Sequence, residues 1–155
     1  MITIVVPTHS YLRKFAQHRA NSQTGNIRVS TSKSWGIALW KILSRREFRR
    51  DARRQLDYED QIVLEISEYM YSRSGFTLTD ENVFLFNRHL KSQFEEALFD
   101  HITINITSDF KTNIEQQIIT YLNFYNITER ERSLDSLLKA YQRWRTSRNY
   151  LLIKV

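Results

Sequence analysis

The chain has 155 residues, of which 41% are hydrophobic and 13% aromatic, so it can bury a core and is not expected to be disordered. It contains no cysteine, which excludes disulfides and cysteine-based zinc sites, and its three glycines and one proline disfavour turn-rich sandwiches and barrels. The net charge of +6 is segregated: residues 1–54 carry +10, residues 55–135 carry −9 and residues 136–155 carry +5. This layout favours a polyanion or an acidic protein surface as partner.

The first half of the chain alternates predicted strands and helices. Alternating apolar residues predict strands over 2–6, 26–30 and 58–68, each with one buried face. Helical spacing of apolar residues predicts helices over 11–20 and 33–50, both preceded by hydroxyl residues that could cap them.

The second half is predicted to be mainly helical. Thr79 is expected to cap a helix because acidic residues follow it in the first turn, where the helix dipole favours anions. Ser108 is expected to cap a second helix that reaches about residue 125. Thr128 and Glu131 have the spacing of a capping box, which predicts that the last helix begins at 129 and continues to about 147.

These elements predict an α+β fold in which a small antiparallel or mixed sheet packs with about five helices. The apolar tail over 150–155 could add a closing strand that pairs with residues 2–6. We expect a single domain over 1–155, within which residues 1–75 could form a basic α+β lobe and residues 76–149 a helical lobe.

The densest cationic run is an arginine-rich segment at the end of the helix predicted over 33–50. Its members are Arg45, Arg46, Arg49, Arg50, Arg53 and Arg54, with Lys33 and Lys41 nearer the helix start. On a helix, the arginines fall into rows at i, i+4 and i+8, and such a stripe suits the repeating phosphates of a nucleic acid. The alternative is a solvated face that pairs with the acidic middle of the same chain. Membrane headgroups are disfavoured because only Phe48 and Ala52 offer an apolar face.

A second basic surface is predicted on the C-terminal helix. Its candidate contacts are Lys139, Gln142, Arg143, Arg145, Ser147 and Arg148. Helices over 110–125 and 129–147, joined by a turn at 126–128, would have the length of a helix-turn-helix unit. The alternative is an ordinary helical hairpin in which Tyr141 and Trp144 belong to the core.

No catalytic signature is found in the sequence, and we expect no cofactor, no metal and no enzymatic activity. The histidines His9, His18, His89 and His101 have no metal-binding spacing, and the serine-rich segment 30–34 lacks the glycines of a phosphate-binding loop. The carboxylates of Glu95, Glu96 and Asp100 on one helix leave a divalent-metal enzyme as the weakest alternative.

The C-terminal stretches 119–129 and 134–145 resemble the ends of small uncharacterised proteins encoded by phages and other mobile elements. The resemblance rests on a helix, the capping turn Ile127-Thr128-Glu129 and a basic aromatic helix. It implies a setting, namely the cytoplasm of a bacterial or phage-infected cell, or a virion, but no activity.

We therefore expect a non-enzymatic nucleic-acid-binding accessory or regulatory protein, with double-stranded DNA as its partner. The alternative is a structural or adaptor subunit of a larger assembly such as a phage particle, in which the chain binds further copies of itself or other proteins. We expect no membrane partner, since no stretch approaches the roughly 18 apolar residues that a membrane-spanning helix needs. We also expect no small-molecule substrate.

Overall fold

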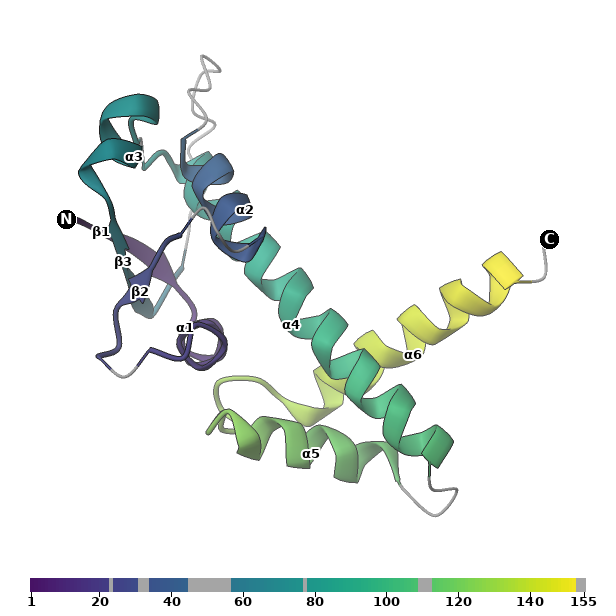
Figure 1. The fold of residues 1–155 in the computed structure, drawn as a ribbon. Coiled ribbons are helices and arrows are strands. Elements are labelled where there is room, and N and C mark those ends of the chain that lie inside the picture. The colour runs from purple at the N-terminus through teal and green to yellow at the C-terminus, as the bar shows by residue number, and fades with distance from the viewer. Residues whose placement is uncertain (23, 31–33, 45–56, 77, 109–112, 153–155) are drawn as a thin grey trace. The chain divides into compact units, whose positions relative to one another are not determined.

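The computed structural model describes residues 1–22, 24–30, 34–44, 57–76, 78–108 and 113–152 (Figure 1). It confirms the α+β fold. The strands are β1 (Ile2–Thr8), β2 (Ile27–Arg28) and β3 (Asp60–Ile66). The helices are α1 (Ser10–Arg19), α2 (Ser34–Leu43), α3 (Glu68–Ser74), α4 (Asp80–Ser108), α5 (Ile114–Phe124) and α6 (Leu134–Leu152). The chain divides within α4 into two compact units, Met1–Gln93 and Phe94–Val155.

The sheet of the first unit is mixed and has the strand order β1-β3-β2. β1 is antiparallel to β3, with Ile2 opposite Ile66 and Thr8 opposite Asp60, whereas β2 is parallel to β3. Because side chains alternate along a strand, one face of the sheet carries the buried residues and the other carries exposed ones. Helices α1, α2 and the first part of α4 pack on the buried face (Figure 1).

A group of charged side chains joins β1, α1 and the start of β3. The carboxylate of Glu59 accepts hydrogen bonds from the Ser10 backbone N–H at 3.0 Å and from His9 Nδ1 at 2.8 Å. Arg13 Nε donates to Asp60 Oδ2 at 2.6 Å. Residue 9 caps α1 without a side-chain hydrogen bond, so Glu59 supplies the acceptor that the first turn of α1 needs.

Asn87, buried on α4, connects that helix to the end of β1. Its Nδ2 donates to the backbone oxygen of Pro7 at 2.8 Å and to that of Val83 at 2.9 Å, and its Oδ1 accepts from the Thr8 hydroxyl. Asn87 also hydrogen-bonds with the side chain of Tyr58. Burial raises the pKa of Tyr58, although this hydrogen bond acts to lower it. A buried amide must find such partners because an unpaired one costs free energy. The network therefore fixes α4 against the sheet.

The second unit is a helical hairpin, α5 and α6, packed on the C-terminal part of α4. Phe94 and Phe99 are buried on α4 and contact aromatic rings of both other helices: the Phe94 and Tyr121 centroids lie 5.5 Å apart, and those of Phe99 and Tyr141 5.7 Å apart. The Tyr121 hydroxyl also donates to the Phe94 backbone oxygen at 3.3 Å. Tyr141 is buried, as the alternative of an ordinary helical hairpin predicts, whereas Trp144 is half-buried.

Several predicted boundaries are wrong. Residues 150–152 belong to α6 and not to a closing strand, because no glycine or proline interrupts the helix after Leu134. β1 pairs with β3 instead. Residues 153–155 lie outside the described part. α4 runs on to Ser108, and α5 is capped instead by Asn113, whose side chain accepts from the Glu115 N–H at 3.0 Å.

Other boundaries agree better with the sequence. Thr79 caps α4 as expected, with its hydroxyl accepting from the Asn82 N–H at 3.1 Å. The short helix α3, which the apolar pattern did not predict, begins after Ser67, whose hydroxyl accepts from the Met70 N–H at 3.2 Å. The predicted turn near Gly75 is present, with φ of 61° at that residue.

Candidate nucleic-acid interface

The described candidate contacts of the C-terminal basic surface lie on α6. Lys139, Gln142, Arg143 and Thr146 follow one another at helical spacing, so they share one face, and with Ser147 they line a shallow groove. All five side chains are exposed. Figure 1 shows the C-terminal end of α6 extending away from α5.

The cations of α6 differ in their surroundings. Lys139 pairs with Asp135 one turn earlier, with Nζ and Oδ2 2.7 Å apart, but both side chains are exposed and such a pair contributes at most about 1 kcal/mol. Arg143 Nε donates to the Lys139 backbone oxygen at 3.2 Å, which leaves its terminal nitrogens available. Within the described part of the chain, no carboxylate lies within ion-pairing distance of Arg143, Arg145 or Arg148.

Arg148 lies on a different side of α6 from the groove residues. Its guanidinium carbon is 4.8 Å from the centroid of the Trp144 ring, and Trp144 itself packs on Phe99 with centroids 5.2 Å apart. Trp144 therefore packs on Phe99 and also contacts the Arg148 guanidinium through its ring. A cation–π contact of this kind orients the guanidinium. The structure thus places Lys139, Gln142 and Arg143 together and Arg148 apart from them.

The predicted helix-turn-helix connection is wrong. Residues 125–133 separate α5 from α6, whereas a helix-turn-helix turn has roughly three to four residues. Thr128 and Glu131 do interact, with the Thr128 N–H and hydroxyl donating to Glu131 Oε2 at 2.7 and 2.9 Å, but they close an isolated turn. α6 starts later, where the Glu129 carboxylate accepts from the Leu134 N–H at 3.0 Å.

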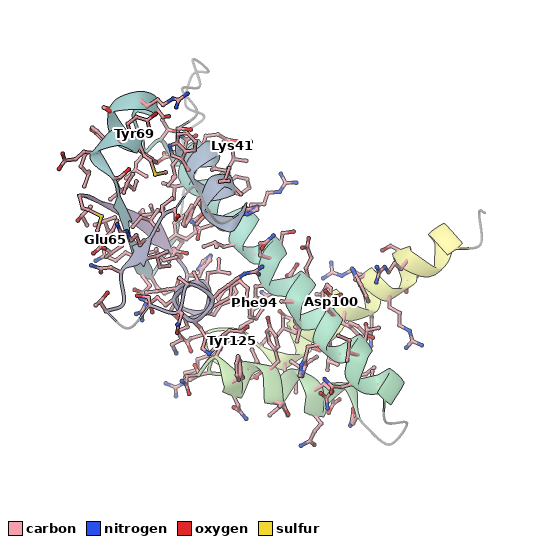
Figure 2. All side chains as sticks on the ribbon, in the orientation of Figure 1. Lys41, Glu65, Tyr69, Phe94, Asp100 and Tyr125 are labelled. Carbon is pink, nitrogen blue, oxygen red and sulfur yellow. The ribbon has the colours of Figure 1, made fainter. Side chains whose placement is uncertain are left out.

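The arginine-rich segment and Lys33 lie outside the described residues, so the structure gives no geometry for Lys33, Arg45, Arg46, Arg49, Arg50, Arg53 or Arg54. Lys41 is described: it is exposed in the last turn of α2 (Figure 2). It lines a groove with Arg88 and His89 of α4, a cation and an imidazole that the sequence did not connect to it. Only the packing of α2 beside α4 brings them together.

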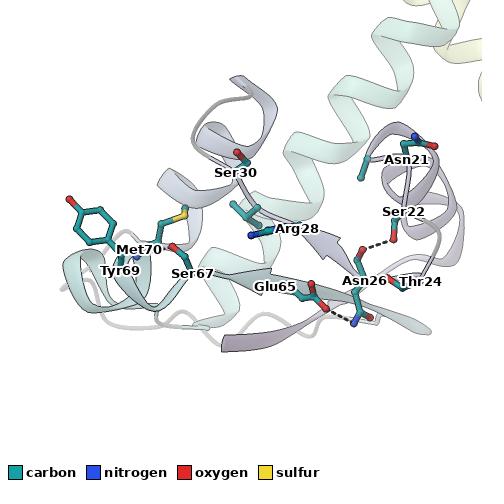
Figure 3. A pocket seen from close by; sticks show the side chains of 12 residues that line it. Asn21, Ser22, Thr24, Asn26, Arg28, Ser30, Glu65, Ser67, Tyr69 and Met70 are labelled. Atoms are coloured by element: carbon teal, nitrogen blue, oxygen red, sulfur yellow. Dashed lines mark hydrogen bonds between the residues drawn. The ribbon is translucent and has the colours of Figure 1, made fainter. Parts of the chain in front are cut away.

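A polar hollow of about 720 Å³ lies along β2 and the end of β3 (Figure 3). Arg28 and Glu65 both line it, and Glu65 accepts a hydrogen bond from Asn26 Nδ2 at 2.9 Å. Asn26 in turn accepts from the Ser22 hydroxyl through its backbone oxygen. One cation and one anion offset each other here, so the hollow does not select for a polyanion.

No cluster of three or more histidine and carboxylate side chains able to hold a metal ion occurs among the residues that the structure describes. Glu95, one of the carboxylates considered for a metal, instead pairs with Arg132 of the same unit, with Oε1 and Nη2 3.2 Å apart. Neither the helix over 80–108 nor the other described helices combine the length and apolar character needed to cross a bilayer.

No protein-family model matches the chain. Searches of curated proteins and of solved structures likewise find no significant match. The function must therefore be inferred from the chain's own geometry and charge.

Proposed function

We propose that the chain is a non-enzymatic nucleic-acid-binding accessory protein that contacts the phosphate backbone of double-stranded DNA through α6. The observation that carries the proposal is the exposed arginine set Arg143, Arg145 and Arg148, which has no carboxylate partner within the described residues. Such a protein would act in the cytoplasm of a bacterial or phage-infected cell.

The charge of this region suits a phosphate backbone. Residues 136–155 carry five cations and no acidic residue, so no anion on this stretch competes for the arginines. Guanidinium groups bind phosphate oxygens through two parallel hydrogen bonds, and each neutralised phosphate releases condensed counterions. The arginine-rich segment at 45–54 adds a second source of positive charge in the sequence.

The proposal rests on phosphate contacts and not on base readout. In a helix-turn-helix protein, the N-terminal residues of the recognition helix reach the bases. In α6 the N-terminal half carries Leu137 and Tyr141 into the core, and the three arginines, at 143, 145 and 148, begin only at the middle of the helix. This order favours binding that tolerates many DNA sequences.

The test is the affinity for a fluorescent duplex, measured by anisotropy at several salt concentrations. Each phosphate contact contributes about 0.9 to the slope of log affinity against log salt. We expect replacement of Arg143, Arg145 and Arg148 by alanine to weaken binding and to flatten this slope by about one to two units, because Arg148 lies on a different side of α6 from Arg143.

The matched control removes three exposed cations that lie elsewhere, at Arg19, Arg73 and Arg130. We expect a smaller loss from this control although it lowers the net charge equally. Lysine at the three α6 positions should retain much of the salt slope, because the slope depends on charge and lysine keeps the positive charge. Lysine loses only the two parallel hydrogen bonds that a guanidinium makes to one phosphate. Equal losses in the control and the α6 variant would overturn the proposal.

The second candidate function, a subunit of a larger assembly, is favoured by large apolar side chains that remain exposed. Tyr69 is 68% exposed, Ile104 63% and Phe124 60%. Such residues can form interfaces when they gather on one surface. Light scattering on the purified chain would favour this function if it showed an oligomer that persists when the α6 arginines are replaced.

A further inference from the structure

A groove of about 320 Å³ lies between α2 and α4 in the unit Met1–Gln93. It is lined by Lys41, Ile42, Leu85, Arg88, His89 and Ser92. The four α4 residues are spaced at i, i+3, i+4 and i+7, which puts them on one face of that helix. Figure 2 shows Lys41 on α2, next to the first part of α4.

The apolar and charged parts of this groove are separated. Ile42 and Leu85 are half-buried and form its apolar side, whereas Lys41 and Arg88 are exposed and keep their charged ends in water. This arrangement leaves both cations accessible to a ligand that approaches from solvent.

Like charges gather here without compensation. Among the described residues that line the groove there is no aspartate or glutamate, and neither Lys41 nor Arg88 has an ion-pair partner within the described part of the chain. Neighbouring cations repel one another, so a bound anion would stabilise the arrangement.

The donors in this groove fit a phosphate group. The ammonium of Lys41 on α2 and the guanidinium of Arg88 on α4 supply charged donors from two helices to one oxyanion. We propose that the groove between α2 and α4 binds a phosphate, and that this phosphate is a phosphodiester of the nucleic-acid backbone. The choice of phosphodiester rests on the proposed function; the phosphate site itself does not.

The sequence next to the groove agrees with a polyanionic ligand. Lys41 lies three residues before Ser44, and the arginine-rich segment 45–54 follows directly in the chain. The most basic stretch of the sequence is therefore joined directly to the end of α2 that carries Lys41.

The experiment is a ¹H–¹⁵N NMR titration of the full chain, first with inorganic pyrophosphate and then with a short DNA duplex. We expect both ligands to shift the amide signals of residues 41–44 and 85–92. The Lys41→Ala/Arg88→Ala variant should bind pyrophosphate at least tenfold more weakly than the unmodified chain. Its matched control, Arg19→Ala/Arg73→Ala, loses the same charge within the same unit and should bind normally.

The outcomes separate this proposal from the proposed function. If pyrophosphate shifts the groove signals but DNA does not, the phosphodiester assignment is overturned and a free phosphate or nucleotide is the ligand class. If neither ligand shifts them, the site itself is overturned. Should DNA still bind through α6 in that case, the proposed function survives without this groove; loss of all DNA binding would remove both.

Discussion

Two asparagines end helices in the left-handed conformation. Asn21 after α1 has φ of 52° and Asn126 after α5 has φ of 54°. At the second site the N–H of Ile127 donates to Leu122 O at 2.9 Å and the N–H of Asn126 to Asn123 O at 3.0 Å, which together form a Schellman motif. Ile127 and Leu122, the two positions at which this motif usually carries a hydrophobic contact, are both buried.

We expect Asn126→Ala to lower the free energy of unfolding by about 1 kcal/mol, because a Cβ residue other than asparagine or aspartate is disfavoured at positive φ. Asn126→Gly keeps the conformation without strain and should be neutral or stabilising. Urea denaturation followed by circular dichroism measures both. Equal stability of the alanine and glycine variants would contradict this account.

The Glu59 carboxylate makes the stability of the first unit depend on pH. Burial alone would raise its pKa, but hydrogen bonds from the Ser10 N–H and from His9 outweigh burial, so the pKa lies below its ordinary value of 4.5. The folded state therefore favours the ionised form. Its stabilisation is complete above the unfolded pKa and is lost as pH falls through the folded pKa.

We expect Glu59→Gln to be less stable than the unmodified chain at pH 7, and the difference to shrink as the pH falls below 4.5. Denaturation curves between pH 7 and pH 3 would show this. Asp57→Asn, at an exposed carboxylate nearby, is the control and should not change the pH profile. A stability difference that stays constant with pH would show that Glu59 acts through packing alone.

At the scale of single elements, Gly36 sets how α2 packs. A Cβ at this position would lie 2.4 Å from the Ser30 backbone oxygen, closer than two such atoms can approach. Replacing a helical glycine by alanine ordinarily stabilises by about 1 kcal/mol, but forcing an atom into a packed contact costs about 1–3 kcal/mol. The atoms nearest to this Cβ position are the backbone O, N and C of Ser30, so the clash cannot be relieved by a change of side-chain rotamer.

We therefore expect Gly36→Ala to destabilise the protein by about 1 kcal/mol, the reverse of the usual helix effect. Thermal unfolding of the variant measures the change. A stabilised Gly36→Ala would mean that the segment before α2 shifts to make room.

The start of α6 shows why the sequence misplaced an element. Thr128 and Glu131 form only half of the predicted capping box: the Glu131 carboxylate accepts from the Thr128 N–H and hydroxyl, but the Glu131 N–H donates to the Thr128 backbone oxygen at 3.0 Å and not to the hydroxyl. The preceding residue, Ile127, is however buried as part of the Schellman motif, and the turn that follows does not continue into a helix. Ser133 and Glu129 cap α6 instead. Helix ends depend on such tertiary burial, which a capping pattern alone does not contain.

The candidate site was predictable to a different degree on each helix. On α6 the i, i+3, i+4 spacing alone places Lys139, Gln142 and Arg143 on one face, and the structure agrees. Arg88 and His89 are separated from Lys41 by more than forty residues in the chain. No periodicity joins them, because their proximity comes from helix packing, so the sequence could not identify this groove.

At the scale of the whole molecule, positive charge resides in both units. Lys41 and Arg88 lie in one unit and the α6 arginines in the other. If both groups contact the same DNA molecule, the decreases in salt slope caused by replacing each group with alanine should add in the variant that combines the replacements. We expect this additivity on a long duplex in salt-dependent anisotropy. A combined variant no weaker than the α6 variant alone would show that only the second unit binds the long duplex.

The two outer strands of the sheet bear on how copies of this chain could meet. β2 is only Ile27–Arg28, and because Val29 N–H donates to Glu65 O, the Arg28 amide faces away from β3 on a residue whose side chain is charged and exposed. On the opposite border, β1 contains Pro7, which has no N–H to offer. Brevity, charge and proline are the features by which proteins guard a sheet border against joining another. Any self-association should therefore occur through helix surfaces, and not by one sheet growing into the next.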